Sequence, residues 1–141
     1  MMVDALTTSI RIAASGLQAQ SMRLRIVSEN LANIESAGTT PGSDPYRRQT
    51  VVFGTELDRL SDIPLVEITT LSTDPAPFRL EYQPGHPAAD ASGYVKLPNV
   101  NTIIELADMK QANRSYEANL QVIKQAREMM SMTIDILRGQ N

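Results

Sequence analysis

The stretch TIIELADMKQANRSYEANLQVIKQAREMMSMTIDILR, residues 102–138, decides the fold of this chain. It contains neither proline nor glycine, so no residue in it interrupts a helix. Apolar residues recur every seven positions along it, as Met109, Tyr116, Ile123, Met130 and Leu137, with Leu106, Leu120 and Ile134 beside them. Thr102 and Glu105 have the spacing of a capping box, and Pro98 precedes them. We therefore predict one long helix that begins at Thr102.

The first 38 residues repeat this pattern. Their seven-residue series is Ile10, Leu17, Leu24 and Leu31, and Leu6, Ala13, Ala14, Val27 and Ile34 lie on the same face. Asp4 is predicted to cap the start of this helix and Gly38 to end it, three residues before Pro41. A period of 3.5 residues favours left-handed supercoiling of packed helices. We expect the two helices to pair as a coiled-coil-like hairpin.

Two features of these helices suggest that pairing within one chain does not bury all of their apolar surface. Polar residues interrupt the apolar series, and they are Gln20, Ser28, Asn113 and Arg127. Apolar residues also lie away from it, as Ile12, Ile26, Val122 and Met132 do. An intramolecular hairpin would bury its own seam and leave these residues exposed, whereas neighbouring chains would cover them.

The middle of the chain has a different composition. All eight prolines lie between Pro41 and Pro98, five of the seven glycines between Gly38 and Gly93, and five of the six aromatic residues between Tyr46 and Tyr94. Short runs of β-prone residues at 48–53, 65–71, 78–82 and 94–97 are bounded by proline or glycine. The predicted fold is therefore mainly α with a small β-rich middle. Residues 1–38 and 100–141 form the paired terminal helices, and residues 39–99 form the β and loop segment.

Charge and composition exclude several classes of protein. The net charge of −3 comes from residues 39–98, and no basic face suits a phosphate backbone, so nucleic acid is not an expected partner. The chain contains no cysteine, which excludes disulfides and thiolate metal sites. No apolar run approaches the length of a membrane span. The N-terminus lacks the pattern of a cleavable signal, so we expect any export to use another route.

Catalytic machinery is not visible either. His86 is the only histidine, and a lone histidine between glycine and proline is a poor metal ligand. Asp74, Glu81 and Asp90 are scattered over expected loops, without the spacing of an acid–base pair. Phosphate-binding glycine loops and nucleophile elbows are absent from the sequence. We expect no enzyme activity, no cofactor, no metal and no small-molecule substrate.

Two groups of polar residues stand out from the helical and strand patterns. The first comprises Asn30 and Asn33 at the end of the first helix, followed by Tyr46, Arg47 and Arg48. Asparagine near a helix end competes for backbone hydrogen bonds, so these amides belong to an exposed end, bond to a neighbouring chain or fix the exit loop. The second group runs through Tyr94, Pro98, Asn99 and Asn101 to Tyr116, Glu117 and Asn119. A strand, a proline stop and a helix cap account for its first part only.

These motifs resemble a known family, the flagellar basal-body rod proteins of bacteria. Asn30-Leu31-Ala32-Asn33 is similar to the N-terminal signature of rod, hook and hook-associated proteins. Residues 93–101, Asp108-Met109 and Tyr116-Glu117-Ala118-Asn119 are similar to the proximal rod subtype, as are Pro45-Tyr46-Arg47-Arg48 and Pro84-Gly85-His86-Pro87. The resemblance covers about the first 50 and last 50 residues well, and the middle in patches.

The resemblance implies a structural subunit whose terminal helices form the inner coiled-coil layer of a helical axial rod. Such a rod spans the periplasm, transmits torque and encloses an export channel. The implied partners are copies of the chain, other rod subunits, the rod–MS ring junction protein and the flagellar type III export apparatus. The residues expected at subunit interfaces are Ile10, Leu17, Leu24, Asn30, Leu31, Asn33, Tyr46, Arg47, Arg48, Tyr94, Pro98, Asn99, Asn101, Met109, Tyr116, Glu117, Asn119, Ile123, Met130, Ile134 and Leu137.

Two alternatives remain open from the sequence. A stand-alone helical adaptor or an export chaperone would use the same helical hairpin without polymerising. A small hydrolase would need an acid–base pair that converges in a pocket of the middle segment, for which His86 and Asp90 are the only candidates of note.

Overall fold

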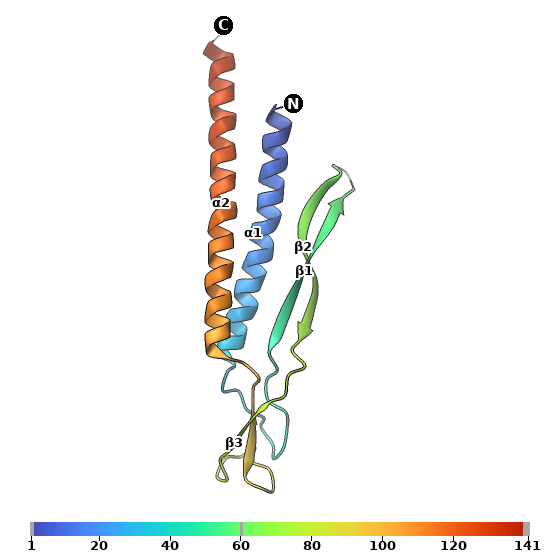
Figure 1. The fold of residues 1–141 in the computed structure, drawn as a ribbon, viewed down its shortest axis with the longest axis vertical. Coiled ribbons are helices and arrows are strands. Elements are labelled where there is room, and N and C mark those ends of the chain that lie inside the picture. The colour runs from blue at the N-terminus through green and yellow to red at the C-terminus, as the bar shows by residue number, and fades with distance from the viewer. Residues whose placement is uncertain (1, 60, 140–141) are drawn as a thin grey trace. The chain divides into compact units, whose positions relative to one another are not determined.

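The computed structural model describes residues 2–59 and 61–139. Its elements, in chain order, are α1 (Met2–Ala32), β1 (Gln49–Asp58), β2 (Ile63–Thr73), β3 (Arg79–Tyr82), β4 (Tyr94–Leu97) and α2 (Thr102–Gly139), as Figure 1 shows. β1 pairs with β2 and β3 with β4, so the strands form two separate two-stranded sheets. The predicted fold class is therefore confirmed: two long terminal helices and a small β-containing middle.

The chain divides into two compact units. Unit 1 comprises residues 2–22, 53–59, 61–69 and 111–139, and unit 2 comprises residues 23–52 and 70–110. Each helix therefore contributes one part to each unit, and so does the β1–β2 hairpin. In the described part of the chain, no helix combines the length and the apolar character that crossing a membrane requires.

In unit 1, α1 and α2 lie side by side and antiparallel (Figure 1). Gly16 of α1 faces Asn119 of α2 so closely that a Cβ on Gly16 would lie 2.8 Å from the Asn119 Nδ2 atom. The fully buried residues among the described part of unit 1 are all small: Ala13, Gly16, Ala19, Ala112 and Ala126. The apolar series Ile10, Leu17, Ile123 and Met130 is only half-buried. Small residues thus set the helix spacing, and the larger apolar residues keep part of their surface exposed.

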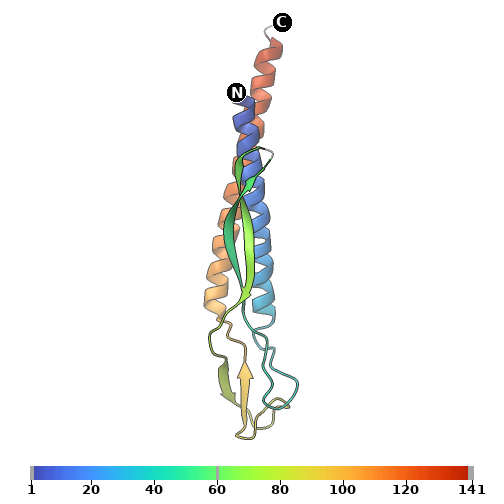
Figure 2. The same ribbon diagram turned by 90° about the vertical axis from the view of Figure 1, so that its right-hand side faces the viewer.

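The β1–β2 hairpin lies against α1 in unit 1, on the side away from α2 (Figures 1 and 2). The Ser15 hydroxyl of α1 accepts a hydrogen bond from the Val66 backbone N–H of β2 at 3.0 Å. Arg11 of α1 also forms an ion pair with Asp58 of β1 at 3.4 Å. α1 is therefore the middle layer of this unit, between the hairpin and α2.

α2 extends past the described start of α1 in unit 1 (Figure 1). Because Gly16 lies against Asn119 and both helices rise about 1.5 Å per residue, Met2 is level with about residue 133. Beyond that point Ile136 and Leu137 are 63% and 62% exposed. This end of α2 has no helix of its own chain to cover it within the described residues.

In unit 2, β3 and β4 form an antiparallel pair in the register Arg79↔Leu97, Leu80↔Lys96, Glu81↔Val95 and Tyr82↔Tyr94. The rings of Tyr82 and Tyr94 meet edge to face, with centroids 5.3 Å apart. Val95 is fully buried, with Ala88, Pro98 and Val100 also buried in this unit. The strand predicted at 94–97 has the predicted bounds, whereas β1 runs on to Asp58, beyond the predicted end at residue 53.

The ends of both helices differ from the sequence predictions. α1 ends at Ala32, six residues before Gly38, and Asp4 lies inside its first turn instead of capping it. The Asn33 amide donates to the Glu29 carbonyl at 2.9 Å, which takes up an acceptor near the end of the helix. At the start of α2 the cap is Asn101, whose Oδ1 accepts from the backbone N–H of Ile103 at 2.9 Å. Thr102 is therefore not the cap.

Replacing Gly16 with valine should destabilise the helix pair by about 1–3 kcal/mol, because the added methyl groups overpack the contact with Asn119. Helix propensity alone would slightly favour valine over glycine. The free energy of unfolding, from urea titration followed by circular dichroism, checks this. Ala14→Val is the control, since Ala14 is an exposed neighbour in the same helix; it should cost only about 0.5 kcal/mol. Equal losses in the two variants would show that the Gly16 contact does not limit stability.

Candidate functional site

A buried carboxylate lies at the centre of unit 2. Glu105, in the first turn of α2, has no exposed surface. Its Oε1 accepts a hydrogen bond from Arg48 Nε at 2.5 Å, and its Oε2 accepts one from Asn30 Nδ2 at 3.1 Å. Both oxygens are therefore engaged, and the charge is compensated by the guanidinium. This carboxylate joins the start of α2 to the last turns of α1 and to the segment that enters β1.

Asn30 makes every hydrogen bond that an amide side chain can make. Its Nδ2 donates to Glu105 and to the Gln49 carbonyl at 2.9 Å. Its Oδ1 accepts from the Gln49 N–H at 2.9 Å and from the Tyr46 hydroxyl at 2.8 Å. The amide thus pairs with both polar groups of the Gln49 backbone, as a neighbouring strand would. Aspartate in place of Asn30 could not donate the two hydrogen bonds from Nδ2, and leucine could make none of the four.

Arg48 and Asn99 tie the next layer together. The Arg48 guanidinium also lies 3.4 Å from the Asp74 carboxylate. The Arg48 N–H donates to Asn99 Oδ1 at 2.8 Å, and Asn99 Nδ2 donates to the carbonyls of Asp74 and Ala76, both at 3.1 Å. We call Asn30, Tyr46, Arg48, Asp74, Asn99 and Glu105 the junction network. It fixes the chain paths into β1, out of β2 and into α2.

Neighbouring residues extend this arrangement toward solvent. Arg47 stacks over the Phe78 ring, with its guanidinium carbon 4.1 Å from the centroid, and donates to the Asp74 carbonyl at 3.0 Å. Lys96 lies 2.8 Å from the Asp44 carboxylate, and the hydrogen bond and charge of Lys96 lower the pKa of Asp44. Asp44 is fully exposed, so this pair adds little to stability.

The environment of the network shifts two pKa values. Burial by itself lowers the pKa of Arg48, but the hydrogen bond and charge of Glu105, together with Asp74, outweigh it and the net shift is upward. Burial raises the pKa of Tyr46, and the charges of Glu29 and Glu105 raise it further. Arg48 therefore stays a cation and Tyr46 stays a neutral hydrogen-bond donor at neutral pH.

The structure brings some of the predicted interface residues together and leaves others apart. Asn30, Tyr46, Arg47, Arg48 and Asn99 meet in unit 2, where their polar groups bond within the chain. Pro98 is buried next to them, Asn101 caps α2, and Asn33 accepts a hydrogen bond from the Ser36 hydroxyl at 3.0 Å. Asn119 lies against Gly16 in unit 1. The half-buried members of the prediction are Ile10, Leu17, Leu24, Leu31, Met109, Tyr116, Ile123 and Met130, and the exposed ones are Tyr94, Glu117, Ile134 and Leu137. Their role between subunits stays a prediction.

Sequence reasoning missed the partners that these residues meet. Glu105 was assigned to a capping box, yet both its oxygens serve the network. Asp74 was considered only as a scattered loop acid, although its side chain and carbonyl hold two of the predicted residues. The one signal in the sequence is the pair Arg47-Arg48 followed by Gln49, between two segments that contain asparagines, which indicates polar contacts without identifying their acidic partner.

The residues considered for metal binding or catalysis take part in local hydrogen bonds. Among the described residues, no group of three or more His, Cys, Asp or Glu side chains is placed to hold a metal ion. His86 Nδ1 accepts a hydrogen bond from the Ala88 N–H at 3.0 Å, so this histidine stabilises its own turn. Asp90 likewise bonds to the N–H groups of Ser92 and Tyr94. The network orders backbone segments, and the surfaces open to partners lie on the helices and the hairpin.

Comparison with known proteins gives matches at both ends and over the whole length. Residues 10–38 match the family described as flagella basal body rod protein, and residues 91–136 match the C-terminal region of the flagellar basal body rod FlgEFG proteins. The chain is 57% identical to the flagellar basal-body rod protein FlgC of Agrobacterium fabrum, over 97% of this chain and 99% of that protein. It is 40% identical to FlgC of Salmonella typhimurium, over 94% and 98%, and 37% identical to FlgC of Borreliella burgdorferi, over 95% and 99%.

Replacing Glu105 with glutamine should destabilise unit 2 strongly. Glutamine keeps the volume and an acceptor for Asn30, but leaves the Arg48 guanidinium without its closest anion. We expect a loss of about 3 kcal/mol, the low end for a broken buried pair, because the Arg48 side chain keeps 19% exposure. The matched control is Asp74→Asn, which removes the more distant and more exposed anion of the same guanidinium and should cost less than about 1 kcal/mol. Urea titration measures both, and equal losses would contradict the central role of Glu105.

The raised pKa of Tyr46 predicts a loss of stability at alkaline pH. The folded state holds this phenolic proton more tightly than the unfolded state, whose pKa is about 10. The contribution is therefore complete below about pH 10 and disappears as the pH rises through the folded pKa. Tyr46→Phe should lower stability by about 1 kcal/mol at pH 8, through the lost bond to Asn30, and reduce the alkaline loss. Tyr82→Phe, at an exposed ring, serves as the control and should keep the alkaline loss of the wild type.

Proposed function

Because the chain belongs to the family of flagellar basal-body rod proteins and is a structural subunit of that rod, we propose that it builds the proximal part of the rod. In this proposal copies of the chain stack helically with other rod subunits into a hollow axial shaft. The shaft transmits torque and forms part of the export channel. The similarity to FlgC proteins over 97% of the chain is the observation that carries the proposal.

The exposed apolar residues of the helices support a role in assembly. On α2 of unit 1, Val122, Met129, Met132 and Ile136 are 42–63% exposed and recur at helical spacing along one stripe. In unit 2, Ile103, Ile104 and Leu106 of the first turns of α2 are also more than half exposed. Apolar stripes of this kind on a helix indicate contact with other chains. Residues 1–38 and 100–141 then form the inner coiled-coil layer, with residues 39–99 outside it.

The family places the chain in the flagellar basal body together with other rod components. The finer assignments are part of our proposal. The chain crosses the inner membrane through the flagellar type III export apparatus. In the periplasm it joins copies of itself, other rod subunits and the rod–MS ring junction protein. A stand-alone adaptor or chaperone gains no support from the similarity to rod proteins, and neither does a small hydrolase.

Deletion of the gene in the bacterium that carries it should abolish swimming, because the shaft would be interrupted. The wild-type chain supplied from a plasmid should restore swimming, and mass spectrometry should find it in purified basal bodies. A deletion strain that still swims, or basal bodies without the chain, would contradict the proposal.

A second arm of this experiment separates assembly from folding. The double variant Ile136→Asp with Leu137→Asp changes residues that are more than 60% exposed, so the subunit should keep the circular dichroism spectrum of the wild type. It should nevertheless fail to restore swimming, because carboxylates would enter an apolar subunit contact. The control is Gln121→Asp with Gln125→Asp, which adds the same charge at exposed polar positions of the same helix. Full swimming in the first variant would show that this end of α2 makes no essential contact.

A further inference from the structure

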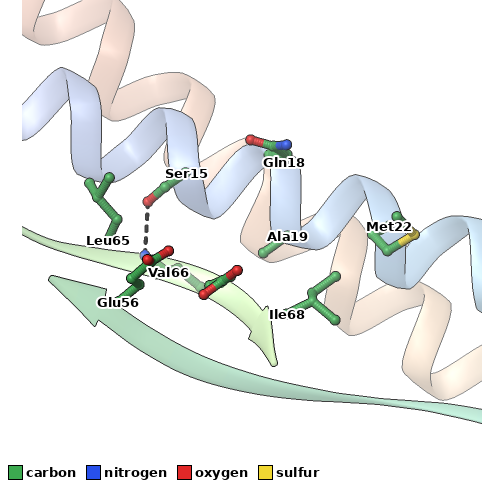
Figure 3. A pocket seen from close by; sticks show the side chains of 9 residues that line it. Ser15, Gln18, Ala19, Met22, Glu56, Leu65, Val66 and Ile68 are labelled. Carbon is green, nitrogen blue, oxygen red and sulfur yellow. Dashed lines mark hydrogen bonds between the residues drawn. The ribbon is translucent and has the colours of Figure 1, made fainter. Parts of the chain in front are cut away.

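A groove in unit 1 runs between α1 and the β1–β2 hairpin (Figure 3). Ala19 and Met22 of α1 lie opposite Ile68 of β2, so part of its lining is apolar (Figure 3). The hydrogen bond from the Val66 N–H to Ser15 holds the hairpin in place beside it. The groove is therefore a surface of fixed shape, built by two elements that are distant in the sequence.

Two carboxylates, Glu56 of β1 and Glu67 of β2, line the same groove. They are exposed and close enough for the charge of Glu56 to raise the pKa of Glu67. Within residues 2–59 and 61–139, no basic side chain lies within ion-pair distance of either one. Like charges held together repel each other, and a cation between them would relieve this repulsion.

The helix α2 of the same molecule cannot supply that cation. In Figure 1, α1 lies between the hairpin and α2 in unit 1. The close contact between Gly16 and Asn119 leaves no space for a side chain to pass between the helices there. Within unit 1, α2 therefore leaves these two carboxylates open to a cation from another molecule.

One face of α2 has the complementary character. Positions separated by four, seven, eleven, fourteen and eighteen residues share a helix face, and from residue 120 they are Leu120, Lys124, Arg127, Ser131, Ile134 and Arg138. All six are exposed, and none is acidic. Among the described residues, the three cations of this face have no ion-pair partner. We call this set the basic stripe.

We propose that the basic stripe of a second copy of this chain lies in the groove between α1 and the hairpin. Lys124 and Arg127, one helical turn apart, would face Glu56 and Glu67, and the aliphatic members of the stripe would cover the apolar lining. The inference rests on the proposed rod function, and adds to it the two surfaces that make one contact between copies.

The geometry makes this contact open-ended. The groove and α2 lie on opposite sides of α1, so one copy uses its groove for one neighbour and its stripe for another. A contact between two different surfaces repeats without closing, unless the rotation between copies returns to the start. It therefore produces a helical stack, and its charged part weakens as salt concentration rises.

Disulfide trapping tests the contact directly, because the chain contains no cysteine of its own. The full chain with Glu67→Cys and Arg127→Cys is produced in the deletion strain, and basal bodies are purified under oxidising conditions. We expect disulfide-linked species of two or more copies, at least tenfold more abundant than in either single-cysteine strain. The control pairs Glu67→Cys with Arg114→Cys, which is an exposed cation on a different face of α2. This control should remain monomeric.

Charge reversal provides an independent measurement. Glu56→Lys with Glu67→Lys should reduce swimming at least tenfold, and adding Lys124→Glu with Arg127→Glu should restore it. If the chain is found in basal bodies but the disulfide species and the charge rescue are both absent, the groove contact is wrong and the rod function stands. Crosslinks that form only to a different rod protein would overturn the second copy as the occupant. If the chain is absent from basal bodies, the proposed function fails first.

Discussion

The buried Glu105 carboxylate is the constraint on which the rest of unit 2 depends. A fully buried charge is costly unless it is paired and hydrogen-bonded, and this one is satisfied only when Arg48 and Asn30 both reach it. Arg48 is just before β1, Asn30 is in the last turns of α1, and Glu105 is in the first turn of α2. One ionised group thus requires three separate segments to meet. The hydrophobic core alone is too small to hold these segments together. Among the described residues, the largest fully buried side chains are Glu105, Val95, Asn30 and Pro98.

Unit 1 is built on a different principle, and this difference bears on the function. Its buried residues are alanines and a glycine, which allow α1 and α2 to approach closely but remove little apolar surface from water. The larger apolar residues therefore stay half-buried or exposed along both helices. A subunit designed to be complete alone would place leucine and isoleucine between its helices. In the proposed assembly, neighbouring subunits would cover these residues, and their burial would then stabilise the assembled state.

The middle segment adds little stability of its own, and its main contribution is to hold particular residues in place. Each of its two sheets has only two strands, and an isolated two-stranded hairpin is marginally stable in water. The β1–β2 hairpin is held to α1 by the hydrogen bond of Val66 to Ser15 and by the ion pair of Arg11 with Asp58, and together with α1 it forms a groove. Two of the eight acids of this segment, Glu56 and Glu67, line that groove. The basic stripe on α2 contains three cations and no acid, so its charge is complementary to that of the groove.

The sequence by itself determined the two long helices and the position of β4. Seven-residue periodicity and the confinement of proline to residues 41–98 were sufficient, because both are local properties of the backbone. The family was also readable from short motifs in their order. Only the tertiary structure decided which polar groups meet: Arg48 and Glu105 are 57 positions apart, and no local rule pairs them. It also showed that Asn101, and not Thr102, caps α2, and that both Glu105 oxygens bond to Arg48 and Asn30. The positions that contact Gly16 and Val66 likewise depend on three-dimensional packing, which periodicity narrows to a face but does not assign to a partner.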